Sequence, residues 1–325
     1  MRVTIVADAA ALGWSDVDDS PRAIREVLAR HGLALKKRWG QNFMVNRRSR
    51  ERIVDLLDPV GDRSVWEVGP GLGAITAILV DRGALVTAFE VDHGLIAVLR
   101  DRFADRVPIV AGDAARTIAC AYDRARESGR TPERIVGNLP YRSAAAIVTT
   151  LLEHPGLADT AMRMVFTVQK EMARRMAAPV GGRDYSPLTV LCATCADVRL
   201  AGDLSAGSFY PAPEVTSSIV VLDVRPTDTS TRAVTTLVAR ALFSSRRKTI
   251  ANNLSVLGAR SGLPVDRLRD AADRAGISLD LRAERVGPGQ FARFADELIR
   301  GGYRPDGDPS GTTTPASPDR SRDRR

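Results

Sequence analysis

Cysteine is scarce in this chain, which has only Cys120, Cys192 and Cys195 among its 325 residues. Three thiols cannot form a disulfide framework, and such scarcity is typical of proteins from a reducing compartment. Cys192 and Cys195 are spaced C-x-x-C, but no second pair of Cys or His accompanies them. They lie in an apolar run, 188–196, that we interpret as a buried strand. We therefore expect packing residues rather than zinc ligands or a redox pair.

Long apolar runs and histidines are also few. No stretch approaches the roughly 20 apolar residues of a membrane-spanning helix, and residues 1–11 lack a basic segment followed by a long apolar core. These absences argue against a membrane protein and predict a cytoplasmic one. His31, His93 and His154 lack the spacing of metal ligands, so we expect no metal.

Basic residues, in contrast, are in excess. The chain has 47 Lys and Arg against 39 Asp and Glu, which gives a formal net charge of +8. Such a surplus favours a polyanionic partner, because neutralising phosphates releases their counterions. A mildly basic protein without such a partner is an equally good interpretation of the composition alone. Two clusters, 36–38 and 246–248, are candidate phosphate contacts, the alternative being a solvated surface.

Apolar segments with strand and helix patterns alternate through the first two thirds of the chain. This alternation predicts an α/β fold with a mostly parallel, seven-stranded sheet covered on both faces. One helix is expected before the first strand, at 47–57, and two between strands, at 74–82 and 95–103. The strands are expected at 64–68, 84–89, 107–110, 134–136, 162–168, 188–195 and 217–224.

The two ends of the chain differ from this pattern. Apolar residues at helical spacing in 232–243, 264–275 and 289–300 predict a small helical domain, and a short helix is expected at 20–32. From residue 304 onward large apolar side chains are missing, which predicts disorder. The expected division is 1–35 (leader and short helix), 36–225 (main domain), 226–303 (helical, RNA-contacting domain) and 304–325 (disordered tail).

A glycine-rich turn, Glu-Val-Gly-Pro-Gly-Leu-Gly at 67–73, follows the first expected strand and begins a helix. Glycines let a backbone approach a ligand closely. The spacing of Gly69, Gly71 and Gly73 is not G-x-G-x-x-G, and the carboxylate of Glu67 would repel a pyrophosphate. These two details disfavour NAD and favour a zwitterionic amino acid that carries a sulfonium.

Acidic residues follow the next two strands. Glu90 lies about 20 residues after the glycines, where an acid can accept both hydroxyls of a ribose. Asp113, after Gly112, can accept a hydrogen bond from an adenine amino group, although a Gly-Asp pair is common in turns. Ligands bind at the carboxyl ends of parallel strands, so we expect these groups to meet there.

The Asn138-Leu139-Pro140-Tyr141 turn after the fourth strand decides the chemistry. The N6 of adenine is a poor nucleophile, and two acceptors, the Asn138 oxygen and a backbone carbonyl, can orient it by binding its hydrogens. Pro140 fixes the turn and removes a competing donor, and Tyr141 offers a face on which an extruded base stacks. No general base is required, because the alkylated nitrogen is strongly acidic and loses its proton readily. Catalysis would then depend on orientation, which supplies about 7–11 kcal/mol in favourable cases. The alternative is an ordinary Asn-Pro loop.

With this turn, seven ordered motifs resemble the ribosomal RNA adenine N6-dimethyltransferase family, most closely its bacterial small-subunit (16S) members. The resemblance extends from about residue 36 to about residue 300. The motifs are 37–44 (KRWGQNFM, for K-x-x-G-Q-N-F-L), 67–73 (EVGPGLG, for E-I-G-P-G-x-G), 138–141 (NLPY), 169–171 (QKE), 183–186 (RDYS, for K-D-Y-G), 209–213 (FYPAP, for F-x-P-x-P) and 245–249 (SRRKT, for R-R-K-T).

The resemblance implies a Rossmann-like class I methyltransferase that dimethylates two adjacent adenosines in a hairpin loop near the 3′ end of small-subunit rRNA. The assembling small ribosomal subunit would be its partner, and we expect a monomer. Tyr141 and Phe209 would sandwich the target adenine in the Asn138-Leu139-Pro140-Tyr141 site. The cofactor would be S-adenosylmethionine, bound by Asn42, Met44, Gly69, Gly71, Glu90, Asp113 and Asn138.

Five positions depart from the family pattern: Met44 for Leu, Arg142 for Asn, Ser186 with Pro187 for a Gly-containing pair, and Glu214 for Lys. The changes at 186–187 and 214 would alter RNA contacts. Two other functions stay open. One is a non-enzymatic RNA-binding factor that kept the fold, and a more distant one is an NAD-dependent enzyme. The intact turns at 69–73 and 138–141 favour the methyltransferase.

Overall fold

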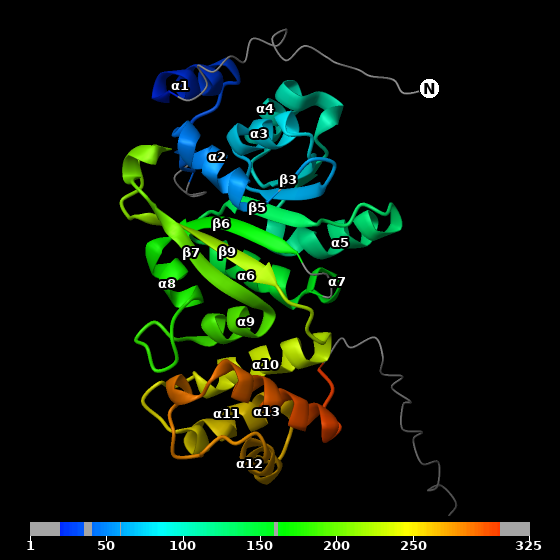
Figure 1. Ribbon diagram of the computed structural model, residues 1–325, viewed down its shortest axis with the longest axis vertical. Helices are drawn as coiled ribbons and strands as arrows, with labels where there is room; N and C mark the ends of the chain where they lie inside the picture. Colours follow the sequence, from blue (N-terminus) through cyan, green and yellow to red (C-terminus); the bar gives the residue numbers. More distant parts are fainter. Residues whose placement is uncertain (1–19, 36–40, 59, 159–161, 306–325) are drawn as a thin grey trace, which may run out of the picture.

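A seven-stranded sheet forms the centre of the computed structural model, which describes residues 20–35, 41–58, 60–158 and 162–305 (Figure 1). The strand order is β4-β3-β2-β5-β6-β9-β7, in which the first five strands are parallel and β9 runs antiparallel to both its neighbours. This order confirms the predicted mostly parallel sheet. The strands are β2 (Ser64–Val68), β3 (Leu85–Glu90), β4 (Ile109–Ala111), β5 (Arg134–Asn138), β6 (Arg163–Gln169), β7 (Ala196–Leu204) and β9 (Ser217–Val224).

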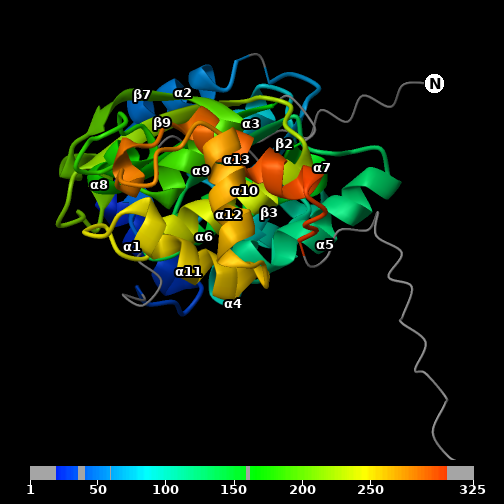
Figure 2. The same ribbon diagram turned by 90° about the horizontal axis from the view of Figure 1, so that it is seen from below.

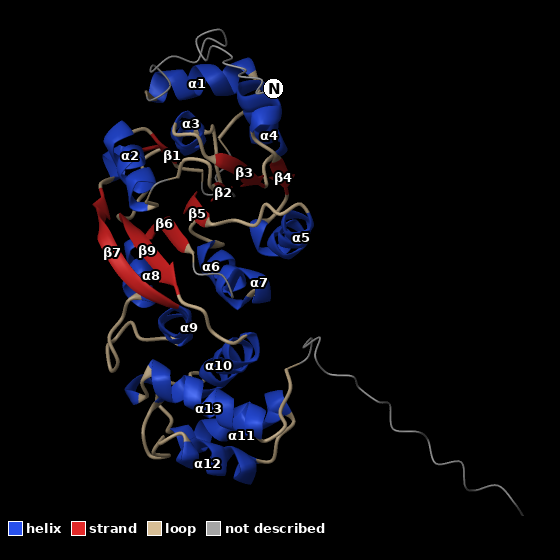
Figure 3. Cartoon of the chain, turned by 45° about the vertical axis from the view of Figure 1, so that its right-hand side comes forward, coloured by secondary structure: helices blue, strands red, loops and turns tan. Residues whose placement is uncertain are grey.

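Helices cover both faces of the sheet (Figure 3). Side chains alternate along each strand, so in β6 Met164 and Phe166 pack on one face while Val165 packs on the other. The face of Val165 carries α2 (Arg47–Leu56), α3 (Ala74–Asp81) and α4 (His93–Phe103). The opposite face carries α5 (Ala114–Glu127), α6 (Ala144–Glu153), α7 (Pro155–Ala158), α8 (Lys170–Met176) and α9 (Pro187–Cys195).

Helix α9 corrects a prediction: the apolar run 188–195 is a helix and not a strand, and the seventh strand is β7 instead. The run is buried on most sides, so its apolar pattern does not distinguish the two structures. The signal lies just before it, where Ser186 is the N-cap, its N–H donates to Thr189 Oγ1 (3.0 Å), and Pro187 occupies the first turn. Cys192 and Cys195 are buried within this helix, and burial raises the pKa of both thiols.

A helical region follows the sheet and lies at one end of the molecule, nearest the viewer in Figure 2. The helices predicted at 232–243, 264–275 and 289–300 are present, while 250–261 is a further helix that was not predicted. Their apolar faces form one cluster that also takes in Tyr185 and Val190, and Tyr185 Oη donates to the Val286 carbonyl (2.9 Å). The helices are α10 (Thr229–Leu242), α11 (Ile250–Ser261), α12 (Val265–Arg274) and α13 (Pro288–Arg300).

Helix α1 (Pro21–Arg30) lies at the other end of the molecule, beside α3 and α4. Its buried residues pack with Phe43, Leu72 and Leu95. Phe43 belongs to β1 (Phe43–Met44), which pairs antiparallel with β8 (Phe209–Tyr210) outside the main sheet. Short 3₁₀ turns occur at η4 (Ala104–Arg106), η5 (Ala206–Ser208) and η6 (Ala283–Arg285). Within the described ranges, no helix is both long and apolar enough to cross a bilayer.

Candidate functional site

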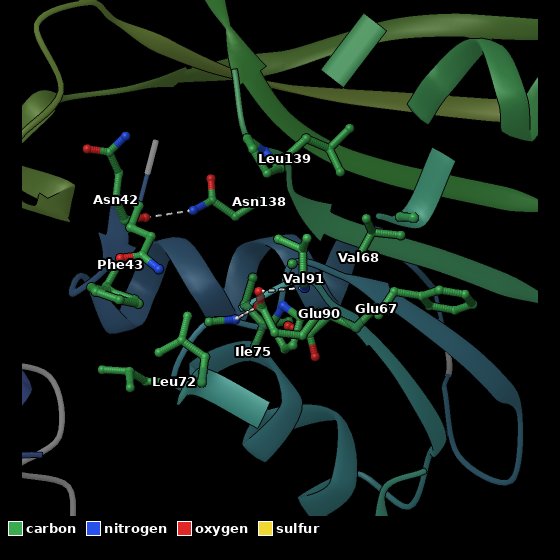
Figure 4. Close-up of a pocket in the computed structure, with 18 of the residues that line it drawn as sticks. Asn42, Phe43, Glu67, Val68, Leu72, Ile75, Glu90, Val91, Asn138 and Leu139 are labelled. Atoms are coloured by element: carbon green, nitrogen blue, oxygen red, sulfur yellow. Dashed lines mark hydrogen bonds between the residues drawn. The ribbon is translucent and has the colours of Figure 1, made fainter. Parts of the chain in front are cut away.

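A cavity of about 240 Å³ lies at the carboxyl ends of β2, β3 and β5, where the sequence motifs were expected to meet (Figure 4). The structure therefore brings together segments that are far apart in the chain. The turn residues Asn138, Leu139, Pro140 and Tyr141 line this cavity, and Phe209 does not. All seven residues predicted to bind the cofactor line it: Asn42, Met44, Gly69, Gly71, Glu90, Asp113 and Asn138.

The glycine turn after β2 needs glycine for conformation as well as for space. Gly71 and Gly73 have φ of +62° and +81°, which L side chains rarely adopt. A Cβ on Gly71 would lie 3.1 Å from the ring of Phe43, and one on Gly73 would lie 2.5 Å from the ring of Phe103. The turn is thus closed against two aromatic rings, and its backbone forms one wall of the cavity.

Glu90, at the end of β3, is 6% exposed and is held by three backbone N–H groups. Val91 and Asp92 donate to Oε1 (2.8 and 2.9 Å), and Gly71 donates to Oε2 (3.3 Å). Burial raises the pKa of Glu90, and the three N–H groups oppose that rise. Because a carboxylate oxygen has two lone pairs, Oε2 keeps an acceptor position for a ligand hydroxyl.

Glu67 lies deeper, 1% exposed, and accepts a hydrogen bond from Thr76 Oγ1 (2.5 Å). Burial raises the pKa of Glu67 to about 7, with the Thr76 hydroxyl acting in the opposite direction. Arg102, also on the lining, donates to the Leu72 carbonyl (2.7 Å). The lining therefore combines a strongly buried acid with Glu90, an environment that suits a cationic ligand.

Asp113 has a structural role that the sequence did not indicate. It is the N-cap of α5, and its Oδ1 accepts the N–H of Ala115 (3.0 Å). Its side chain lines the cavity, and Oδ2 accepts no hydrogen bond from the described residues. The cap therefore holds the carboxylate in one orientation while leaving an acceptor for an adenine amino group.

Asn138, the last residue of β5, has its side-chain amide fixed by one hydrogen bond. Nδ2 donates to the Asn42 carbonyl (2.8 Å), and Oδ1 faces away from that bond (Figure 4). Next in the turn, the Leu139 N–H donates to the Thr167 carbonyl (3.0 Å). Among the described residues, neither Asn138 Oδ1 nor the Leu139 carbonyl accepts a hydrogen bond. Two acceptors of neighbouring residues are therefore available at the cavity.

The two predicted stacking residues differ in position. Tyr141 is half-buried, and its hydroxyl forms a hydrogen bond with Ser217 Oγ (2.7 Å). Burial raises the pKa of Tyr141, so the phenol is neutral near pH 7. Phe209 pairs with Met44 through β8 and β1, is 4% exposed and packs in the apolar cluster beneath α2 and α3. In this structure the cavity therefore offers Tyr141 to a base, and stacking by Phe209 stays a prediction.

Several lining residues were not predicted from the sequence. Ile24 and Val27 of α1 close one side of the cavity, and Gln41, Phe43 and Arg102 also line it. The helix itself was expected, and its i, i+3 apolar spacing indicates a buried face without saying what that face covers. The basic cluster 36–38 lies outside the described residues. Arg246, Arg247 and Lys248 are exposed, and Arg246 Nη1 donates to the Arg183 carbonyl (2.9 Å).

The cavity fits S-adenosylmethionine. Gly69 and Gly71 put backbone without side chains on the cavity wall, the Glu90 carboxylate keeps an acceptor for a ribose hydroxyl, and Asp113 offers Oδ2 to an adenine. The acidic lining suits a sulfonium. The sheet and its cavity place the chain among the class I S-adenosylmethionine-dependent methyltransferases.

Comparison with known proteins narrows this class. The model of the ribosomal RNA adenine dimethylase family matches residues 32–300, and the chain belongs to this family. A Treponema denticola protein named ribosomal RNA small subunit methyltransferase A is 34% identical over 284 residues, which cover 86% of this chain and 94% of that protein. A Myxococcus xanthus protein of the same name is 37% identical over 280 residues, covering 84% and 94%.

Solved structures agree with the family. A dimethyladenosine transferase from Plasmodium falciparum has the same fold, with a TM-score of 0.66 at 21% identity, covering 81% of this chain and 99% of that one. The 23S rRNA methyltransferase ErmE superposes with a TM-score of 0.54 at 27% identity, covering 79% and 100%. The predicted family, fold class, enzyme class and cofactor are confirmed.

Proposed function

We propose that this chain dimethylates N6 of two adjacent adenosines in a hairpin loop near the 3′ end of small-subunit (16S) rRNA, as a monomer acting on the assembling small subunit. The names of the Treponema denticola and Myxococcus xanthus relatives support the small-subunit target. The observation that carries the chemistry is the pair of available acceptors at the cavity, Asn138 Oδ1 and the Leu139 carbonyl, beside the ring of Tyr141.

The residues of the turn orient the target amine. Asn138 Oδ1 and the Leu139 carbonyl accept the two hydrogens of N6, which turns the nitrogen lone pair toward the methyl donor. Tyr141 stacks against the extruded base and limits its rotation. The bound cofactor supplies an electrophilic methyl group. That methyl group would pass to N6, and the proton that N6 loses would pass to water, since no side chain at the turn is required as a base. The two acceptors also stabilise the positive charge that develops on N6.

The other half of the cavity holds the cofactor in our proposal. Glu90 accepts a ribose hydroxyl and Asp113 accepts the adenine amino group. Gly69 and Gly71 provide the backbone wall beside the amino-acid portion, and Asn42 and Met44 close it from the β1 side. Asn138 takes part in both halves, because its Nδ2 is held by the Asn42 carbonyl while its Oδ1 meets the target.

The RNA-contacting surface extends to the helical region, 226–303, with 36–225 as the catalytic domain. A groove lined by arginines supports this proposal, since RNA affinity depends on phosphate neutralisation. Arg246 joins the groove to the 246–248 cluster. The groove is formed by α8, the loop before α9 and the loop after α10, and its lining is Glu171, Arg174, Arg175, Arg183, Asp184, Ser186 and Arg246.

One experiment tests the reaction and the target together. The full chain is given labelled S-adenosylmethionine with small subunits that lack the modification, large subunits, naked rRNA or DNA, and the modified nucleotide is mapped. We expect N6-dimethyladenosine at two adjacent positions in small subunits. Label in large subunits would overturn the target, and cofactor binding without transfer to any substrate would favour the non-enzymatic RNA-binding alternative.

A further inference from the structure

Arg142 lies at the mouth of the cavity, immediately after Tyr141. The turn that holds it is fixed by two hydrogen bonds, because the N–H groups of Ser143 and Ala144 both donate to the Pro140 carbonyl (3.0 and 2.9 Å). The Arg142 side chain is exposed and lines the cavity. Its backbone is thus ordered while its charged end faces solvent.

The guanidinium has no protein partner to hold it. Within the described ranges, Arg142 makes no hydrogen bond, ion pair or ring contact. The other arginine of the lining, Arg102, is engaged by the Leu72 carbonyl and lies 5.3 Å from the centre of the Phe103 ring. Among the described lining residues, Arg142 is therefore the cation that can take an anion brought by a ligand.

The surface next to Arg142 leaves space for a nucleic-acid strand. The next exposed positions of α6 are Ala145 and Ala146, whose side chains are short and uncharged. Tyr141 is anchored to Ser217, and consecutive Cα atoms are about 3.8 Å apart, so Arg142 stays close to whatever stacks on Tyr141. The ribose and phosphate of a base seated on Tyr141 with its amine at Asn138 would remain outside the cavity, and Arg142 is the exposed residue next to Tyr141 on its lining.

We propose that Arg142 binds the phosphate adjoining the extruded adenosine and thereby sets how deeply the base enters. The inference rests on the proposed function and deepens it by naming a substrate contact. A guanidinium matches a phosphate with two parallel hydrogen bonds, which fixes direction as well as distance. The family pattern more often has Asn at this position, so the contact is expected only in family members that carry a basic side chain here.

The alternative anion is the carboxylate of the cofactor, and the two are separable by experiment. The variants are Arg142→Ala, Arg142→Gln, which keeps length without charge, and Arg142→Lys. The matched control is Arg126→Ala, which removes an exposed arginine in the last turn of α5. For each we measure kcat and KM with unmodified small subunits at several salt concentrations, and cofactor affinity by calorimetry.

We expect Arg142→Ala and Arg142→Gln to raise KM for small subunits about tenfold, since hydrogen bonds to charged groups are strong. The slope of log KM against log salt should fall by about 0.7–0.9, the value for one phosphate. Arg142→Lys should restore the slope, and Arg126→Ala should change neither quantity. Cofactor affinity should be unchanged in all four variants.

An unchanged KM and slope, or a loss confined to kcat, would overturn the proposal. A parallel loss of cofactor affinity would assign Arg142 to the cofactor carboxylate instead. Failure of the proposed function has a different signature, because the unaltered chain would then leave small subunits without label. Direct binding of the unlabelled subunits by filter retention gives the salt slope even in that case, so Arg142 is tested independently of turnover.

Discussion

The two halves of the cavity are built differently. On the cofactor side, hydrogen bonds join residues close in sequence: Glu67 with Thr76, nine positions apart, and Glu90 with the Gly71 N–H, nineteen apart. On the target side, the Asn138–Asn42 bond spans 96 positions and the Tyr141–Ser217 bond spans 76. The hydrogen bonds that hold Glu67 and Glu90 therefore lie within the consecutive segments β2, α3 and β3, whereas the target half exists only once distant segments have packed together.

The halves also differ in how complete they are before a ligand arrives. Three N–H groups already orient Glu90. On the target side, Asn138 Oδ1 and Arg142 have no partner within the described residues. Dipoles that are already oriented lower an activation barrier without having to reorganise. Polar groups that lack a hydrogen-bond partner give selectivity, because only the correct ligand supplies that partner. The difference suggests that cofactor binding is robust and that the target side decides what is methylated.

Asn138→Ala has the largest expected effect, and it acts on the target half of the cavity. Removing an oriented acceptor that acts on charge developing at N6 should lower kcat by roughly 10²–10³ and leave the chain folded. Single-turnover transfer to small subunits and circular dichroism measure the two quantities. Asn252→Ala, in which an exposed asparagine of α11 is lost, serves as the control. Near-normal turnover would remove Asn138 from its assigned role.

Glu67 tests the cofactor side through pH. Its pKa is about 7 in the folded protein against 4.5 for an ordinary glutamate. Between these values the unfolded chain loses its proton first, so the folded state loses stability as pH rises from about 4.5 to 7 and not beyond. The Glu67→Gln variant stays neutral, and we expect the wild-type protein to lose about 3 kcal/mol relative to it across this window.

Urea unfolding of both proteins from pH 4.5 to pH 8 measures this difference. The amide oxygen that Glu67→Gln introduces can still accept from Thr76, so the packing of the turn is retained. Two stability curves that stay parallel across the window would show that Glu67 titrates as an exposed acid does. That result would contradict a buried carboxyl group at Glu67 on the cofactor side of the cavity.

Glu90→Ala should act chiefly on cofactor binding. Losing the acceptor of a ribose hydroxyl is expected to weaken S-adenosylmethionine binding about 30-fold, with a smaller change in the KM for small subunits. Calorimetry reports the first and steady-state transfer the second. Glu127→Ala, at the exposed end of α5, is the matched loss of an acid. An unchanged dissociation constant would remove Glu90 from the ribose site and leave the cofactor half without its main acceptor.

The same division explains what the sequence predicts well. The glycine turn, Glu90 and Asp113 each follow a recognisable strand, so their meeting at one edge follows from the parallel sheet. The contact of Asn138 with Asn42 is not predictable in this way, since no local pattern links positions 96 apart. Helix α9 was missed because a run that is buried on most sides shows no clear apolar periodicity, although Ser186 and Pro187 marked its start.

Two other features depended on tertiary packing. The capping pattern of Ser20, Pro21 and Gly32 predicted helix α1 but could not say that Ile24 and Val27 face the cavity, because an amphipathic face covers whatever the fold presents to it. Phe209 carries the family motif, yet its side chain packs under α2 and α3, where pairing of β8 with β1 holds it. Its stacking on the target adenine stays a prediction, because Phe209 does not line the cavity.

Substitutions of Tyr141 have the smallest expected effects, and they test the contribution of the ring separately from that of the hydroxyl. Tyr141→Ala removes the stacking face and should raise KM for small subunits about tenfold. Tyr141→Phe keeps the face and loses only the bond to Ser217, so a change of about threefold is expected. Ser217→Ala should match Tyr141→Phe, and the double variant should add nothing, because both remove one bond. Additive losses would mean that the hydroxyl meets the RNA directly, and the target half would then be less preorganised than its hydrogen bonds suggest.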